Sequence, residues 1–315
     1  MLTQPQVQRF AHESGIRNLQ VVEKEIVLTY LLQLLAEKGF LKEVAFKGGT
    51  CIRKTWFGAK GRFSTDLDFT CVAAGKSADD FVIQLAESMS EPFHDIQFDL
   101  DLGDDGWYET GDSVSWGCEP HYKHTWGEGT IRLQVSNREV PTLTPDERAQ
   151  LEVSYFKLLP FRPSAIPCLR IEEILAEKIR ATYQREKPRD IWDPDQFADR
   201  PMPDALIRKL VVTKLWQVSD VFVPDKWFGK LKQAAKWDWD DLHQLVRGGA
   251  PDPKLMLERC TKRFAFLSQL DADEAALAAD PHQRQTDVHQ RSIEACNRLA
   301  QEHRLTCARF ATMVK

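Results

Sequence analysis

The segment from Val44 to Cys71 limits the possible folds more strongly than any other part of the chain. Its apolar run at residues 44–46 is stopped by two consecutive glycines, which predicts a strand that ends in a tight turn. We expect a helix to open at Thr50 and a second strand to occupy residues 66–71, where acidic and apolar side chains alternate before the sequence becomes apolar. This order of elements is typical of an α/β unit, and we expect both short strands to be central in a sheet.

Asp66 and Asp68 are the first candidate site residues. Side chains two positions apart on a strand project from the same face, so the two carboxylates should converge. Two like charges this close repel each other unless a cation lies between them, and hard oxygen ligands suit Mg²⁺. An isolated Asp-x-Asp is more often the solvated face of a strand. The pair therefore indicates a metal site only in combination with other features of the sequence.

The turn at Gly48, Gly49 and Thr50 supplies a second half of the same site. Two glycines let the backbone approach a phosphate closely, and the helix that follows directs free N–H groups toward it. The Thr50 hydroxyl can add a hydrogen bond. Together with Asp66 and Asp68, this turn predicts a metal-assisted phosphate site.

The rest of the chain is expected to be α+β, with a mixed sheet flanked by helices. Residues 22–38 have apolar side chains at helical spacing and predict an amphipathic helix whose apolar side lies in the core. Residues 95–140 predict antiparallel strands with an irregular excursion. From about residue 170 the sequence is mainly helical, so we place a boundary in the Pro-bearing segment that precedes it, between domains 1–165 and 166–315.

Composition excludes several classes of protein. Apolar residues make up 43% and charged residues 28% of the 315 positions, as in a globular chain. Seven scattered cysteines, an odd number, favour reduced thiols over a disulfide framework. The absence of an apolar run of about 20 residues or a signal peptide predicts no membrane span and a cytoplasmic location. A net charge of −5 argues against nucleic-acid binding through the overall field, although local basic patches can still bind it.

The two motifs resemble the signature of polymerase-β-type nucleotidyltransferases, and the fuller sequences FKGGTCIRK and RFSTDLDF resemble the AbiEii/AbiGii toxin family. The resemblance implies a nucleotidyltransferase-type sheet. It also implies that Asp66 and Asp68 bind metal and act in catalysis. The residues that it assigns to the nucleotide are Lys47, Gly48, Gly49, Thr50, Arg62 and Ser64.

Residues 172–193 resemble the later motif of the same family, a helical lysine followed by Arg-Asp-aromatic-Asp. Lys178 shares a helical face with apolar residues. This position favours a role in which its ammonium group binds a nucleotide phosphate as a point charge. Asp190 is flanked by basic residues that favour its ionised form, as a general base requires, and Asp193 is the fallback. The alternative for Lys178 is a side chain whose ammonium group reaches water. The alternative for Asp190 is a helix N-cap or an ion pair with Arg189.

One position departs from the superfamily pattern. Enzymes of this type often carry a third carboxylate on a later strand, and the corresponding residue here is Gln134, an amide without negative charge. Asp99 or Asp101 could substitute for it, although we favour solvent-exposed acids on an alternating strand for both. A two-metal mechanism is therefore in doubt, while phosphoryl transfer does not strictly require one.

Other signals carry less weight. Cys118, His121 and His124 have the spacing of soft-metal ligands but lack an evident fourth ligand, so we favour loop histidines over zinc. The acidic run at residues 237–241 is expected to be the exposed start of a helix. Tryptophans next to basic residues could stack on bases, but core packing is the expected role for each.

These features predict an enzyme that uses Mg²⁺ or Mn²⁺ to move an NMP unit from an NTP to a hydroxyl group. The family resemblance implies RNA, such as a tRNA 3′ end, as acceptor, a toxin role and an antitoxin encoded nearby. Two alternatives stay open, a non-catalytic nucleotide-binding module, suggested by Gln134, and a transferase that modifies a small molecule.

Overall fold

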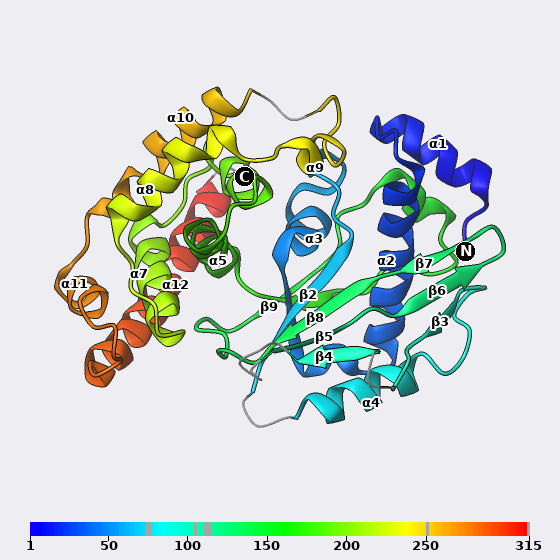
Figure 1. The fold of residues 1–315 in the computed structure, drawn as a ribbon, viewed down its shortest axis with the longest axis horizontal. Coiled ribbons are helices and arrows are strands. Elements are labelled where there is room, and N and C mark those ends of the chain that lie inside the picture. The colour runs from blue at the N-terminus through cyan, green and yellow to red at the C-terminus, as the bar shows by residue number, and fades with distance from the viewer. Residues whose placement is uncertain (74–76, 104–105, 110–114, 250–251, 314–315) are drawn as a thin grey trace. The chain divides into compact units, whose positions relative to one another are not determined.

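The computed structural model describes residues 1–313 apart from 74–76, 104–105, 110–114 and 250–251, with the backbone alone for residues 305–313. The chain forms two compact units (Figure 1). Unit 1 comprises Met1–Val140, Pro145–Leu169 and Asp240–Ala250. Unit 2 comprises Pro141–Thr144, Arg170–Trp239 and Pro251–Lys315.

Unit 1 is built on a seven-stranded mixed sheet in the order β4-β5-β8-β2-β1-β10-β9. Its strands are β1 (Val44–Lys47), β2 (Asp66–Cys71), β4 (Trp107–Glu109), β5 (Ser115–Cys118), β8 (Arg132–Ser136), β9 (Asp146–Arg148) and β10 (Ile166–Cys168). A second, three-stranded sheet contains β3 (Gln97–Asp99), β6 (His121–His124) and β7 (Gly127–Thr130). The predicted strands β1 and β2 are therefore confirmed, and both are central in the larger sheet.

Two details of the strand prediction need correction. The helix after the double glycine, α3 (Gly48–Ile52), begins at Gly48 and not at Thr50. The strands of residues 95–140 do not form one antiparallel set, because they are divided between two sheets and β8 runs parallel to β2. Alternation predicts a strand, but it carries no information on which partner that strand will find.

The helices of unit 1 are α1 (Gln4–Ser14), α2 (Leu19–Glu37), α3, α4 (Ala78–Ser88) and the short α9 (Asp240–His243). The helix α2 forms as predicted, but its polar side is buried as well, including Glu23, Glu25 and Thr29. It is therefore an internal helix and not an amphipathic surface helix. Its buried carboxylates must be paired with other groups, since an isolated buried charge would be too costly.

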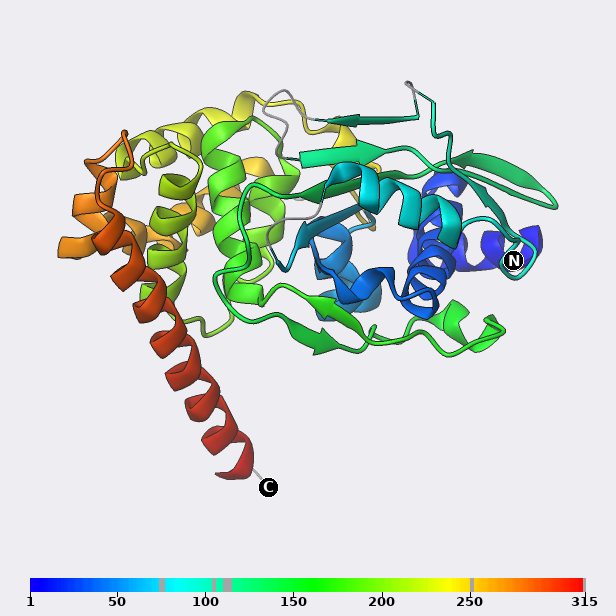
Figure 2. The same ribbon diagram turned by 90° about the horizontal axis from the view of Figure 1, so that it is seen from below.

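Unit 2 is helical, as the sequence predicts. It contains α5 (Ile171–Gln184), α6 (Arg189–Asp195), α7 (Asp204–Gln217), α8 (Pro224–Gln233), α10 (Pro253–Arg263), α11 (Ala272–Ala278) and α12 (Thr286–Met313). The largely buried α7 packs against α5, α11 and α12. Figure 2 shows the C-terminal half of α12 running beyond α7 and α11.

Several side chains have the structural roles that composition suggested. The six cysteines whose side chains are described are free and buried, and the side chain of Cys307 lies outside the described residues. Trp216 and Trp227 lie in the core, while the half-buried Trp56 has the Arg148 guanidinium 3.9 Å from its ring centre. No helix in the described part of the chain combines the length and apolar character that a membrane-spanning segment needs.

Candidate active site

Asp66 and Asp68 lie on β2 and face the same side of the sheet. Both are half-buried, whereas the intervening Leu67 and the following Phe69 are buried, which is the alternation expected of a strand with one polar face. The antiparallel partner of Asp68 on β1 is Lys47, the last residue before the glycine turn. The two acidic residues therefore share one face of the sheet, and Asp68 lies beside the end of β1.

Gly48 is fixed by its backbone and by its surroundings. Its φ angle is +77°, in the left-handed region that favours glycine. A Cβ atom at this position would lie 2.4 Å from the Asp68 Oδ2 atom. The Asp68 carboxylate thus lies directly against the turn, as the sequence analysis expected of a shared site.

Gly49 makes room for a different side chain. A Cβ atom there would lie 2.2 Å from the Nη2 atom of Arg62, so this guanidinium packs onto the turn. Arg62 is buried and donates a hydrogen bond from Nη1 to the Phe63 carbonyl at 3.1 Å. Ser64, the next candidate along the chain, is also buried. Two candidate nucleotide-binding residues, Gly49 and Arg62, are therefore in contact.

The hydroxyl group of Thr50 ties the turn to the acidic strand. It donates to the Asp66 carbonyl at 2.5 Å, and the residue is fully buried. Because the hydroxyl proton has an acceptor within the protein, its clearest role is to hold α3 beside β2. A hydrogen bond from this hydroxyl to phosphate stays a prediction.

A buried charge cluster behind the turn was missed by the sequence analysis. Glu25 of α2 forms ion pairs with Arg53 at 3.1 Å and with Lys54 at 3.2 Å, and all three side chains are 2% exposed. Lys54 also donates to the Thr29 hydroxyl at 2.8 Å. Burial alone would raise the pKa of Glu25, but the two cations outweigh it and lower that pKa. The cluster anchors the helical segment that follows Gly48 to α2.

Gln134 lies where the sequence analysis placed the missing third carboxylate. It pairs with Asp68 in the parallel ladder between β2 and β8, and Arg132 pairs with Asp66. Arg132 donates to the Gln134 Oε1 atom at 2.6 Å, and Gln134 Nε2 donates to the Tyr108 hydroxyl at 3.0 Å. The amide is thus held in one orientation by a guanidinium and a phenol. The Tyr108 ring reaches it across Gly117, where a Cβ atom would lie 2.6 Å from that ring.

Neither alternative acid belongs to this group. Asp99 is exposed on β3 of the three-stranded sheet. Asp101 is exposed after that strand, and its Oδ1 atom accepts a hydrogen bond from the Gly103 N–H at 2.8 Å. The interpretation of both as solvent-exposed acids is confirmed.

The carboxylates of Asp66 and Asp68 fit a hard divalent cation. Within the described residues, no three His, Cys, Asp or Glu side chains form a group that could hold a metal without other ligands. Mg²⁺ and Mn²⁺ commonly bind through one or two carboxylates and complete their shell with water and phosphate oxygens, so the pair suffices for such an ion.

The favoured interpretation of loop histidines is wrong, because His121 and His124 lie on β6. They are three positions apart on that strand and point to opposite faces, which disfavours a shared zinc ion. His121 is exposed on β6, while His124 is buried and its Nε2 atom lies 3.0 Å from Glu23. Burial, together with Glu119, raises the pKa of the Cys118 thiol to about 12.

In unit 2, Lys178, Asp190 and Asp193 are in direct contact. The Lys178 Nζ atom lies 3.1 Å from Asp190 and 2.9 Å from Asp193. Arg185 also binds Asp190, through Nε at 2.6 Å and Nη2 at 3.0 Å. The Lys178 side chain is 10% exposed, so the alternative of an ammonium group in water is wrong.

The environment of Asp190 determines its charge. Burial would raise the pKa of this carboxyl, but Lys178 and Arg185 overcome that effect and lower the pKa to about 2. Asp190 is therefore ionised at neutral pH, as the sequence analysis expected. The same ion pairs make it a weak base while they persist, because they lower its affinity for a proton.

The chain is similar to known nucleotidyltransferase toxins. The sequence model described as "Nucleotidyl transferase AbiEii toxin, Type IV TA system" matches residues 30–305. MenT4, a nucleotidyltransferase toxin from Mycobacterium tuberculosis H37Rv, is similar over 94% of this chain and 100% of its own, with 25% identity and a TM-score of 0.79.

JHP933 from Helicobacter pylori is similar over 82% of this chain and 97% of its own, with 18% identity and a TM-score of 0.46. No curated protein sequence gives a significant match. The match over residues 30–305 confirms the family expected from the two motifs and favours an enzyme over a non-catalytic module. The chain belongs to the AbiEii family of nucleotidyltransferase toxins of type IV toxin-antitoxin systems.

Proposed function

We propose that this nucleotidyltransferase transfers an NMP unit from an NTP to a hydroxyl group of RNA, such as a tRNA 3′ end, with Mg²⁺ or Mn²⁺ bound by Asp66 and Asp68. The observation that carries the proposal is the contact between the Asp68 carboxylate and the Gly48 turn. This contact supports the proposal, because it joins a carboxylate suited to a divalent cation with a glycine turn suited to phosphate.

In this proposal the residues of unit 1 bind and orient the triphosphate. The cation neutralises phosphate charge when it is bound. The lack of side chains at Gly48 and Gly49 lets Asp68 and Arg62 pack directly onto the turn, so Arg62 supplies a guanidinium beside it. Lys47 and Ser64 complete the set that the family motif assigns to the nucleotide.

The cluster of unit 2 is proposed to act in the same reaction. Lys178 and Arg185 carry two positive charges, which balance the charges of Asp190 and Asp193. We propose that Lys178 binds phosphate and that Asp190 accepts the proton of the acceptor hydroxyl. If the Lys178 ammonium group left Asp190 and bound a phosphate, the proton affinity of Asp190 would rise, because the carboxylate would lose a neighbouring cation.

Gln134 favours a site with one tightly bound cation. Its amide occupies the place beside Asp68 and adds no negative charge. Transfer can still proceed, because positioning and charge neutralisation provide most of the catalysis in phosphoryl transfer.

The proposal is tested by incubating the protein with labelled NTPs and total RNA. We expect label in RNA, a requirement for Mg²⁺ or Mn²⁺, and loss of transfer in Asp68→Asn. Label in a small molecule alone would show that the acceptor is a small molecule and not RNA. Transfer at the parent rate by Asp68→Asn would refute the proposed metal site. A cognate antitoxin, the partner that the family implies, should suppress the transfer.

A further inference from the structure

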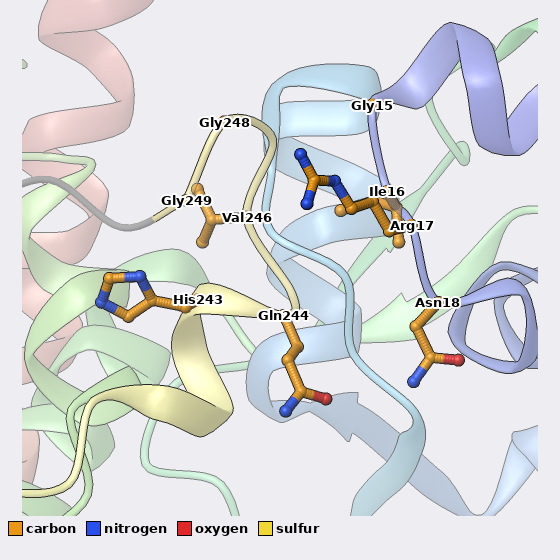
Figure 3. Close-up of a pocket in the computed structure, with 9 residues that line it drawn as sticks. All are labelled: Gly15, Ile16, Arg17, Asn18, His243, Gln244, Val246, Gly248 and Gly249. Carbon is orange, nitrogen blue, oxygen red and sulfur yellow. The ribbon is translucent and has the colours of Figure 1, made fainter.

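A cavity of about 630 Å³ lies in unit 1, between the α1–α2 connection and the segment that follows the start of α9 (Figure 3). One wall contains Gly15, Ile16, Arg17 and Asn18. The other contains His243, Gln244, Val246, Gly248 and Gly249. The volume is within the range of about 300–1,000 Å³ typical of small-ligand pockets.

Two arginines lie at this cavity: Arg17 lines it, and Arg247, which does not line it, packs over the lining residue Gly15. Arg17 is exposed, and its guanidinium extends toward the loop that carries Gly248 (Figure 3). The side chain of Arg247 lies over Gly15, since a Cβ atom there would be 3.0 Å from its Cγ atom. In the described part of the chain, neither guanidinium has a carboxylate within ion-pair distance. The acids Asp240 and Asp241, in the first turn of α9, do not line the cavity.

The remaining lining suits a nucleotide. Ile16 is buried and Val246 half-buried, so they present apolar surface to a base. Asn18 uses its Oδ1 atom to accept from the Gln20 N–H at 3.0 Å, which leaves its NH₂ group as a hydrogen-bond donor. The Gln244 side chain is exposed and offers both a donor and an acceptor.

The cavity is connected to the candidate active site through the backbone. The Phe63 N–H donates to the Leu245 carbonyl at 2.8 Å, so the segment that lines the cavity is held beside the residue after Arg62. The Phe63 ring lies under the Arg53 guanidinium, 3.7 Å from its centre. A chain bound in this cavity would therefore lie close to the irregular segment that leads from Arg62 to Asp66.

We propose that this cavity binds the RNA acceptor. Arg17 and Arg247 contact its phosphates, and a base packs on Ile16 and Val246. The assignment rests on the proposed transfer to RNA and adds a binding site that is separate from the triphosphate site at Gly48 and Asp68. Unpaired arginines beside a cavity with apolar surface and amide groups match the recognition of single-stranded RNA, which combines phosphate contacts with base packing.

The test compares the parent protein with the double variant Arg17→Gln/Arg247→Gln. We expect RNA binding, measured by fluorescence anisotropy with a labelled single-stranded RNA, to weaken about tenfold at 0.1 M salt. The slope of log Kobs against log salt should become less negative by about 1.4, or about 0.7 for each lost phosphate contact. Metal-dependent NTP affinity should be unchanged. Arg9→Gln is the matched control, because Arg9 is an arginine of the same unit that pairs with Glu13 and is 81% exposed.

Three outcomes would overturn the inference. RNA binding with the parent affinity and salt slope in the double variant would overturn the cavity assignment and leave the proposed function standing. An equal loss of NTP affinity would overturn it as well, since the arginines would then serve the nucleotide. A parent protein that binds no RNA would refute the proposed acceptor and this inference together.

Discussion

The Asp68 carboxylate lies against Gly48, so close that a Cβ atom on this glycine would be 2.4 Å from the Asp68 Oδ2 atom. Gly48 and Asp68, which are 20 positions apart in the sequence, therefore form one surface of the candidate active site. Any side chain at position 48 must move the carboxylate or the turn.

Gly48→Ala should impair both stability and function. The φ angle of +77° disfavours alanine, and the contact with Asp68 adds to that strain, so we expect a loss of about 1–3 kcal/mol in unfolding free energy. Transfer should fall at least about tenfold, because the carboxylate is displaced.

Gly39→Ala is the control for Gly48→Ala. Its φ angle is +80°, but the nearest atom to an added Cβ is 3.9 Å away. Urea unfolding and transfer assays on both variants separate backbone strain from the contact with Asp68. Equal transfer rates in the two variants would show that this contact has no functional importance.

Glu25→Gln should destabilise unit 1 strongly. The substitution leaves Arg53 and Lys54 buried with reduced compensation, and breaking a buried ion pair costs about 3–5 kcal/mol. Glu13→Gln is the control, because the Glu13 partner Arg9 is 81% exposed and the loss of a solvent-screened pair should change the stability little. Chemical denaturation followed by circular dichroism would measure both. Similar losses in the two variants would mean that the buried cluster does not anchor the turn.

The local part of the candidate site was predictable from sequence, because it depends on neighbours along the chain. Alternation places Asp66 and Asp68 on one face, and consecutive glycines define the turn. The superfamily pattern pointed to Gln134, but its position beside Asp68 depends on the pairing of β8 with β2, which alternation along the chain does not specify.

Contacts between distant segments were not predictable. Nothing in residues 240–250 indicates that they belong to unit 1, where one backbone hydrogen bond joins Leu245 to Phe63. The pairing of Glu25 with Arg53 likewise depends on how α2 packs beside α3 and not on any local pattern. An ion pair of Asp190 with Arg189 was one of the alternatives, and the guanidinium 2.6 Å from Asp190 belongs to Arg185, another of the basic residues that flank it.

Lys178 and Asp190 should have separable effects on catalysis. Lys178→Ala should weaken NTP binding, measured by calorimetry, because it removes the proposed phosphate ligand. Asp190→Asn should largely keep that binding and lower transfer by about 10²–10⁴-fold, the usual contribution of a general base. Lys230→Ala removes a more exposed ion pair with Glu186 and serves as control. If Asp190→Asn transfers NMP at the parent rate, the role of this cluster is structural.

Asp190 should also make stability depend on pH. Its pKa is lowered from 3.8 to about 2 on folding, so the unfolded state binds this proton more readily. The associated stabilisation is fully present above about pH 5 and is lost as the pH falls toward 2, by about 2 kcal/mol for a shift of this size. Asp190→Asn should remove this part of the acid sensitivity in urea titrations at pH 2–6. An unchanged pH profile would mean that Asp190 is not held as an ionised partner.

Metal-dependent NTP binding by Asp66→Asn tests the central claim most directly. Calorimetry on the parent protein should show NTP affinity that requires Mg²⁺ or Mn²⁺, and the variant should lose it, because the amide keeps the shape of the side chain but not its charge. Asp99→Asn, which removes an exposed acid from the other sheet, should bind as the parent does. An Asp66→Asn protein with the parent's metal-dependent affinity would contradict the assignment of the site to β2 and the glycine turn.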